Sequence, residues 1–537
     1  MPDTVDDNGE KMPGSKVFLA AASVILGLSA NPAGAADLTI GSSLVVTSID
    51  PHFHNASLNN AMAKHFFDPL VAVDDNQQIV PGLAESWRAV DGRTWEFKLR
   101  RGVKFHDGSP FSAEDVKFTL ERAPNVPNSP SSFAQYISQV TGIEITDPYT
   151  IRLKTDKPFP LMPVFMSTFT IVSKKAGDTA TTADYNAGKA TIGTGPYRFV
   201  EFVQGDRIVM RRNPDYWRGA EPWEKVTFRF MTNAGSRLAA LLAGDVDVID
   251  NVQPNDMPRI KSGPRTALWT APSGQLNYVH MDQFRDGAET PHVRDKAGNR
   301  LPANPFMDRR VRLALSKAIN REAIVESVMG GVGVPASQIV PTGFFGYNPN
   351  LRVEPYDPNG ARKLLTEAGY PAGFAFTLHG PQGRYVNEDK ITQAVAQMWA
   401  RIGLDVRVES LMSAVFFPRG SKLEFSIFTA SAANFTGEAG SLINSLLATF
   451  DGARGHGATN RGRYSNARFD KLLDEGLTAL EDSKRASLFA EAQAVAINDV
   501  GLIPIFFSGN VWATSRSIRY QAHTTNETLA MKVRPAR

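Results

Sequence analysis

The chain has 537 residues with 43 Gly, 34 Pro, no Cys and a net charge of +3, and 42% of its residues are hydrophobic. This composition is typical of a globular protein and excludes disordered or collagen-like classes. The absence of Cys excludes disulfides, thiolate metal sites and a lipid-modified cysteine. Because one hydrophobic core stops growing near about 250–300 residues, we expect two large lobes or one domain with a large insertion. Basic and acidic residues are interspersed, so we expect no nucleic-acid partner.

The N-terminal segment has the pattern of a secretory leader. Residues 17–28 are an apolar run that is too short to span a bilayer, which needs about 20 residues. Lys16 precedes the run, and the small residues Ala33 and Ala35 follow it at cleavage spacing. We therefore predict that residues 1–36 are a signal peptide, removed on export, and that the mature protein has no membrane anchor. Four acidic residues precede the run, which leaves Met12 open as an alternative start.

The first half of the chain is dominated by short strands and turns. Residues 94–99 alternate, with Trp95, Phe97 and Leu99 on one face, and this period predicts a half-buried strand. Ser112 followed by Asp115 has the spacing of a capping box and predicts a helix that extends to about residue 121.

The second half alternates between strand and helix patterns. Asp308 is placed to cap an amphipathic helix that carries Val311, Leu315 and Ile319 on one side. Further along, we expect strands at residues 374–378, 404–408 and 424–429, a helix at 391–402, and mostly helix over 467–498. Strand–helix–strand order predicts a parallel sheet with crossover helices, and thus an α/β fold.

This architecture predicts where a ligand binds. In open α/β sheets, ligands bind at the carboxyl ends of the strands. The loop after residue 379 contains Arg384 and Tyr385, and the loop after residue 429 contains Asn434, Phe435 and Glu438. If the two strands are parallel neighbours, both loops lie at one edge of the sheet and form a site.

Catalytic and metal-binding patterns are weak. The chain has no Gly-x-Ser-x-Gly elbow, no His-Glu-x-x-His pair and no phosphate-binding loop. His52 and His54, with His65 downstream, are the one metal-like group, but no acidic residue lies within the ten positions after His54. We therefore expect no metal, no cofactor and no enzymatic activity. A secreted hydrolase stays as the alternative, because acid–base pairs need no local motif.

A series of motifs covers nearly the whole chain after residue 36. They are Pro81-Gly82-Leu83-Ala84-Glu85-Ser86-Trp87, Trp95-Glu96-Phe97-Lys98-Leu99-Arg100-Arg101-Gly102-Val103-Lys104-Phe105-His106-Asp107-Gly108, Gly193-Thr194-Gly195-Pro196-Tyr197, Arg212-Asn213-Pro214-Asp215-Tyr216-Trp217, and Arg309-Arg310-Val311-Arg312-Leu313-Ala314-Leu315. In this order and spacing, the chain resembles the peptide and nickel class, family 5, of solute-binding proteins of ABC importers.

The resemblance implies a two-lobed periplasmic binding protein fold that closes on its ligand by hinge motion. It places lobe one, the larger and discontinuous lobe, at residues 37–273 and 508–537, with lobe two inserted as residues 274–507. The chain would cross between lobes near residues 276–278 and 503–507. The protein would be a periplasmic monomer that binds a peptide or small organic solute reversibly and delivers it to a membrane permease.

The resemblance also bears on the ligand. Dipeptide-binding relatives hold the peptide carboxylate with an arginine in the loop that here contains Arg384. They bind the peptide amine with an aspartate that lies three residues after a tryptophan, whereas this sequence has Asn434 there and no tryptophan. An amide cannot form the charge-assisted bond of a carboxylate. Longer or modified peptides, opines, sugar conjugates and metal complexes therefore stay open.

The predicted ligand-binding residues come from both lobes and from a crossing segment. They are Arg384, Tyr385, Asn434, Phe435, Glu438, His54 and Tyr278.

Overall fold

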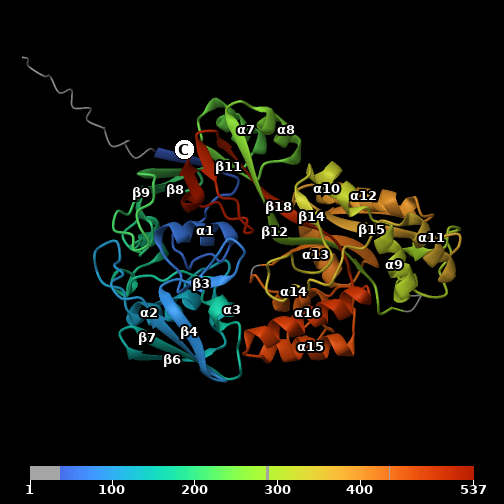
Figure 1. Ribbon diagram of the computed structural model, residues 1–537, viewed down its shortest axis with the longest axis horizontal. Helices are drawn as coiled ribbons and strands as arrows, with labels where there is room; N and C mark the ends of the chain where they lie inside the picture. The colour runs from blue at the N-terminus through green and yellow to red at the C-terminus, as the bar shows by residue number, and fades with distance from the viewer. Residues whose placement is uncertain (1–36, 286–289, 435, 537) are drawn as a thin grey trace, which may run out of the picture.

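The structure is a computed structural model that describes residues 37–285, 290–434 and 436–536. Its backbone forms two lobes that lie side by side (Figure 1). The names lobe one and lobe two are kept for the ranges predicted above. The predicted signal peptide, residues 1–36, lies outside the described residues, and the first strand begins at Asp37.

One twelve-stranded sheet runs through both lobes. Its strands in lobe one are β1 (Asp37–Ser42), β8 (Tyr197–Val203), β9 (Arg207–Arg212), β10 (Lys225–Phe230) and β11 (Val248–Asp250). Its strands in lobe two are β13 (Val293–Arg294), β14 (Gly333–Pro335), β15 (Ala375–Gln382), β16 (Asp405–Met412) and β17 (Ile427–Ala433). The long strands β12 (Thr266–Met281) and β18 (Ile503–Ser515) join the two halves.

The strands β12 and β18 form the connection between the lobes (Figure 1). They pair antiparallel, with a register shift between Pro272 and Leu276, and the predicted crossing segments lie within them. Asn277 links three strands at this point. Its Nδ2 donates to Ser508 Oγ at 2.9 Å, and its Oδ1 accepts from Ser431 Oγ at 2.6 Å. The chain therefore passes between the two lobes along β12 and β18, and hydrogen bonds of Asn277 join these strands to β17.

Lobe two contains the predicted parallel strands. β15 pairs parallel with both β16 and β17, which confirms the strand–helix–strand prediction. The helices are α9 (Arg309–Lys317), α10 (Arg321–Met329), α11 (Pro358–Glu367), α12 (Glu388–Ala400), α13 (Ser413–Ser421), α14 (Ala439–Leu447), α15 (Ala467–Thr478) and α16 (Asp482–Asn498). Asp308 caps α9 as predicted by accepting from the Arg310 N–H, whereas Ile319 lies beyond the end of that helix.

All three strands predicted in lobe two continue further than expected, since β15 ends at Gln382 and β16 at Met412. The strand predicted at residues 424–429 begins at Ile427 and continues to Ala433, through residues that the sequence assigned to a loop. Pairing with β12 explains the extension, because Ala433 lies opposite Gln275 and Ala430 opposite Tyr278. A tertiary partner therefore decides where this strand ends.

Lobe one combines its part of the large sheet with smaller sheets. β4 (Ala84–Asp91), β5 (Thr94–Leu99), β6 (Val140–Asp147) and β7 (Thr150–Thr155) form an antiparallel sheet, and β2 (Val71–Val73) pairs with β3 (Ile79–Pro81) and β19 (Ile518–Tyr520) with β20 (Val533–Pro535). The helices are α1 (Ser57–Phe66), α2 (Ala113–Arg122), α3 (Ala134–Ile137), α4 (Met162–Phe165), α5 (Lys174–Gly177), α6 (Thr182–Asn186), α7 (Ala234–Ala243) and α8 (Met257–Ser262). Ser112 and Asp115 form the predicted capping box of α2.

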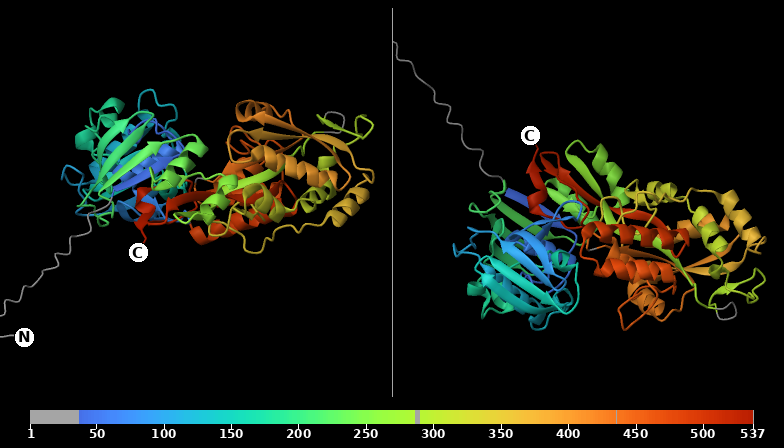
Figure 2. Two further views of the ribbon diagram at one scale, coloured as in Figure 1. Left: turned by 90° about the horizontal axis from the view of Figure 1, so that it is seen from above. Right: turned by 60° about the horizontal axis from the view of Figure 1, so that its bottom comes forward.

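Each lobe has its own hydrophobic core. Lobe two has two clusters, built around residues such as Trp399 and Phe489, and lobe one has clusters around Phe97 and Trp512. A third cluster of lobe one includes Val332 from lobe two, which packs beside the connecting strands. The two lobes can also be told apart in the other views (Figure 2). None of the helices in the described ranges has the length and apolar character needed to cross a bilayer.

Candidate ligand-binding cleft

A cavity of about 510 Å³ lies between the lobes and is lined by residues from both. Its floor consists of residues of the connecting strands, Gln275 on β12 and residues 508–512 on β18. The volume falls within the range of about 300–1,000 Å³ that is usual for small-molecule sites. The position fits a site whose two walls belong to separate rigid bodies.

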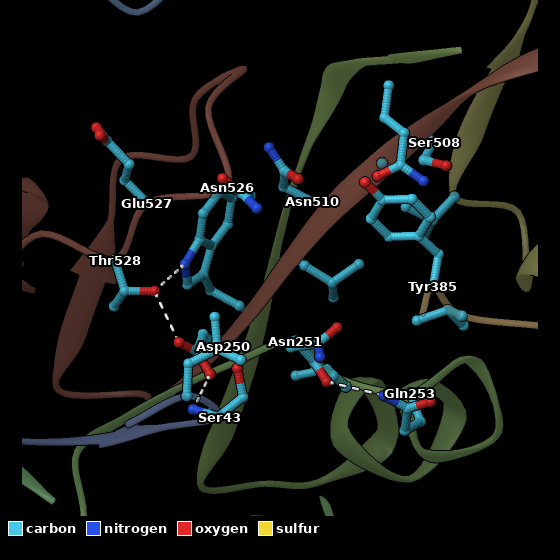
Figure 3. A pocket seen from close by; sticks show the side chains of 18 of the residues that line it. Ser43, Asp250, Asn251, Gln253, Tyr385, Ser508, Asn510, Asn526, Glu527 and Thr528 are labelled. Carbon is cyan, nitrogen blue, oxygen red and sulfur yellow. Dashed lines mark hydrogen bonds between the residues drawn. The ribbon is translucent and has the colours of Figure 1, made fainter. Parts of the chain in front are cut away.

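The lobe-one wall is built at the carboxyl ends of two parallel strands. Ser43 and Leu44 follow β1, and residues 251–254 follow β11, which pairs parallel with β1. α1 and the C-terminal segment 526–528 complete this wall. Figure 3 shows Ser43, Asp250, Asn251 and Thr528 lying together on it.

Asp250 holds this wall together and is not free for a ligand. Its Oδ1 accepts from the Ser43 N–H at 2.7 Å, and its Oδ2 accepts from Thr528 Oγ1 at 3.0 Å (Figure 3). Trp512 Nε1 in turn donates to Thr528 Oγ1 at 3.1 Å. Burial raises the pKa of the Asp250 carboxyl, although the Ser43 N–H and the Arg237 charge oppose the shift. This carboxylate therefore ties β11 to the segment after β1 and to the C-terminal segment.

The other carboxylate of the cavity is also paired. Both oxygens of Glu527 accept from Lys64 Nζ, at 2.6 and 2.8 Å. The remaining polar side chains of the walls and floor are mainly neutral amides and hydroxyls, namely Asn251, Gln253, Gln275, Ser508, Asn510, Asn526 and Tyr385. Such groups bind neutral polar atoms and leave the charge of the cavity to its one arginine.

That arginine is Arg384, in the loop between β15 and α12. Arg384 is exposed and lines the cavity with Tyr385 on the lobe-two wall. Its guanidinium carbon lies 4.8 Å from the centre of the Tyr385 ring. Glu388 Oε2 accepts from the backbone N–H groups of Arg384 and Tyr385, both at 3.1 Å, and this fixes the loop. Burial raises the pKa of the Tyr385 hydroxyl, which therefore stays protonated at neutral pH.

The second predicted loop does not line this cavity. Asn434 is buried, and its side chain closes its own loop: Nδ2 donates to Glu438 O at 2.7 Å, and Oδ1 accepts from the Gly437 N–H at 3.0 Å. Glu438 is 2% exposed and forms an ion pair of 2.5 Å with Arg485. The expected meeting of these side chains with Arg384 is absent, because the loop packs inward and its tip, Gly437, lies against Gln77 of lobe one.

Two further predicted site residues, Tyr278 and His54, lie away from the cavity. Tyr278 is buried in a core cluster of lobe two and does not line the cavity, although burial raises its pKa to about 12 against the opposing charges of Arg461 and Arg384. His54 is half-buried, and its Nδ1 lies 3.0 Å from Thr47 Oγ1. Phe435 lies outside the described residues.

The metal-like histidine group is dispersed. His52 is buried and lies with its Nε2 2.9 Å from Thr170 O, while His65 is buried and bonded to Ala61 and Ala530. Within the ranges that the structure describes, no cluster of three or more His, Cys, Asp or Glu side chains is placed to hold a metal ion.

The lobe-one wall was missed from the sequence. The sequence prediction considers the carboxyl ends of strands in lobe two alone. Applied to the strand that ends at Asp250, the rule would have indicated Asn251 and Gln253. No local pattern marks Asn510 or Asn526, because they reach the cavity only through the course of β18 and the final segment of the chain.

Comparisons with known proteins agree with this geometry. The model of bacterial extracellular solute-binding proteins, family 5 (middle region), matches residues 78–453. Glutathione-binding protein GsiB of Salmonella choleraesuis (strain SC-B67) is 28% identical over 511 residues, which cover 93% of this chain and 95% of that protein. Heme-binding protein A of Haemophilus influenzae is 29% identical over 479 residues, covering 84% of this chain and 83% of that protein. The structure of the periplasmic murein tripeptide binding protein MppA, in its unliganded open form, has a TM-score of 0.78 at 23% identity and covers 93% of this chain and 97% of that one.

The two lobes, the cleft and these matches define a solute-binding protein with the periplasmic binding protein fold. The chain belongs to family 5 of the bacterial extracellular solute-binding proteins. Its function is that of the substrate-binding component of an ABC importer.

Proposed function

We propose that the cavity between the lobes is the solute site and that Arg384 and Tyr385 contact the bound solute. The observation that carries this proposal is the position of the exposed Arg384 guanidinium on the cavity wall, among neutral amides and two carboxylates that are already paired. A guanidinium that is free to form two parallel hydrogen bonds binds a carboxylate strongly. The solute is therefore a small organic acid or a peptide-like molecule.

The names of two relatives support an acidic solute. One relative is named for glutathione and the other for heme, and each of these molecules carries carboxylates. The cavity also matches a compact solute in size, at about 510 Å³. Amide side chains on both the floor and the lobe-one wall would bind the hydroxyl or amide groups of such a molecule.

Export, closure and delivery complete the proposal. Residues 1–36 act as a signal peptide that directs the protein to the periplasm. A bound solute then favours the closed state through the contacts it makes with the second lobe. Bending occurs at β12 and β18, the monomer delivers its solute to a permease, and the solute leaves chemically unchanged.

A thermal-shift screen of ligand-stripped protein tests the site. Peptides, acidic amino-acid conjugates and sugar acids form the panel, and a solute at 100 times its dissociation constant stabilises the folded state by about 2.7 kcal/mol. Leu44→Trp fills the cavity from a side chain that is 53% exposed, so it should abolish the shift. Val90→Trp, at a residue 40% exposed on β4, is the matched control and should keep it.

Two results would contradict the proposal. A solute that still binds to Leu44→Trp with unchanged affinity binds elsewhere. A solute that is consumed on incubation, as followed by mass spectrometry of the recovered solution, would show turnover rather than reversible binding.

A further inference from the structure

Two arginines of lobe two, one of which lines the cavity, lie over the same aromatic ring. The ring is that of Phe417, which is half-buried. Phe417 belongs to α13, and this helix lies on the side of lobe two nearest to lobe one (Figure 1). The guanidinium carbon of Arg384 lies 5.1 Å from the ring centre and that of Arg461 lies 5.5 Å from it. One small molecule resting at this ring could therefore reach both cations.

Neither of these arginines has an acidic partner within residues 37–285, 290–434 and 436–536. Among the residues that the structure describes, no carboxylate oxygen lies within 4.0 Å of either guanidinium group. Arg461 donates to Ser421 Oγ, at 3.2 Å from one nitrogen and 3.4 Å from another. The nearby acid Glu388 is buried beneath the loop, where it accepts from the Arg384 backbone. Both positive charges are therefore uncompensated.

A third arginine, which lies on the helix of Phe417, has acidic partners. Arg419 pairs with Glu424 at 2.7 Å and with Glu409 at 3.3 Å. Arg419, two residues from Phe417, is thus paired with carboxylates, whereas no such pair is found for Arg384 and Arg461 among the described residues. Burial lowers the pKa of Arg461, and the charge of Arg384 lowers it further, so the two cations repel each other. A bound anion would relieve that repulsion.

The remainder of the cleft favours the same charge. Its two carboxylates, Asp250 and Glu527, are bonded within lobe one, so neither is free to receive a ligand ammonium group. Met412, whose side chain lies next to Gly383 in the Arg384 loop, presents apolar surface at 56% exposure. The surface around the two arginines is thus cationic with an apolar margin.

We propose that Arg384 and Arg461, which share the Phe417 ring, each bind one anionic group of the solute, and that the solute is a compact dicarboxylic acid. This inference rests on the proposed function, since it places the solute at the Arg384 wall. It adds Arg461, which no sequence pattern indicated, as the residue that sets a preference for two negative charges over one.

The test compares probes that differ by a single charge. N-acetylglutamate is paired with N-acetylglutamine, and N-acetyl-Ala-Glu with N-acetyl-Ala-Gln, and the dissociation constants are measured by calorimetry on the full-length mature protein. We expect at least one di-acid to bind about tenfold more tightly than its amide partner, the effect of one hydrogen bond to a charged group. Arg461→Gln should remove most of this preference.

Arg463→Gln is the matched control. Arg463 lies on the same loop, but its guanidinium carbon is 3.9 Å from the ring centre of Phe450 rather than over Phe417. The substitution removes the same formal charge and should keep the preference, so a general field effect is separated from direct contact. Thermal unfolding of both variants in the absence of probe checks that they fold.

Three results overturn the inference: no di-acid binds, acid and amide bind equally, or Arg461→Gln keeps the preference. A separate result would contradict the proposed function: a probe that binds the Leu44→Trp variant as tightly as it binds the unchanged protein. A probe that Leu44→Trp excludes but that shows no charge preference leaves the cleft as the site and removes only the role of Arg461.

Discussion

The loops at residues 383–386 and 434–438 follow neighbouring parallel strands, yet they use their charges in opposite ways. Arg384 in the first loop is exposed on the cavity wall, with no carboxylate within 4.0 Å among the described residues. Glu438 in the second loop is buried with Arg485. The order of the strands places both loops at one edge of the sheet, whereas side-chain packing decides which charge faces the solute.

The largest expected effect breaks the buried pair. Glu438→Ala leaves the Arg485 charge inside the protein, where Asp482, at 3.3 Å, is the one remaining ion-pair partner among the described residues. Breaking a buried ion pair costs about 3–5 kcal/mol, so the free energy of unfolding in urea should fall by that amount. Solute affinity should not change.

A double variant serves as the control for this prediction. Replacing both partners, as Glu438→Met with Arg485→Met, removes the unpaired charge and should recover most of the stability. If Glu438→Ala lowered affinity but left stability unchanged, the comparison of the two loops would be reversed.

Lowering the pH should reduce the stability of the folded protein through the buried His65, and it should not change the charge of Arg384. Burial lowers the pKa of His65 to about 4. Its Nδ1 lies 3.0 Å from Ala61 O, and its Nε2 accepts from the Ala530 N–H at 3.0 Å, so the neutral ring is fully bonded. The unfolded chain binds this proton near pH 6.5, so the stability is present above that pH and is lost as the pH falls towards 4.

The size of the acid effect follows from the shift. One pKa unit corresponds to about 1.36 kcal/mol, so His65 alone accounts for up to about 3 kcal/mol between pH 6.5 and 4. Denaturation curves at several pH values should show this loss, and His65→Gln should flatten the dependence. A profile that stays unchanged in the variant would mean that His65 is already charged in the folded protein.

Arg384→Gln should lower solute affinity and leave stability nearly unchanged, the opposite of what is expected for Glu438→Ala. Losing a hydrogen bond to a charged group should weaken binding of an acidic solute by about 1.5–3 kcal/mol, measured by calorimetry. Stability should change by less than about 0.5 kcal/mol, because the side chain is exposed. Lys390→Gln removes an equal charge from an exposed position on α12 and should leave affinity unaltered.

The smallest effect concerns the hydroxyl of Tyr385. Tyr385→Phe keeps the ring that lies 4.8 Å from the Arg384 guanidinium carbon and removes one hydrogen-bonding group from the cavity wall. Affinity should fall by about 1 kcal/mol or less. A larger loss would assign the hydroxyl a bond to a charged group of the solute.

Local patterns predicted much of the fold correctly. The alternation of Trp95, Phe97 and Leu99 gave β5, the capping box gave α2, and Asp308 gave the start of α9. Each of these features depends on residues that lie close together in one short segment of the chain, so it can be recognised without a tertiary context. The parallel pairing of β15 with β16 and β17 followed from element order.

The sequence by itself determined the family, the two-lobed α/β fold and the place of Arg384 and Tyr385 at the carboxyl end of a strand. Only the tertiary structure decided that Glu438 pairs with Arg485, that Arg461 approaches Phe417, and that Asp250 is bonded to Ser43 and Thr528. The physical reason is that burial and pairing of charges depend on segments far apart in the chain, which β12 and β18 bring to one cleft.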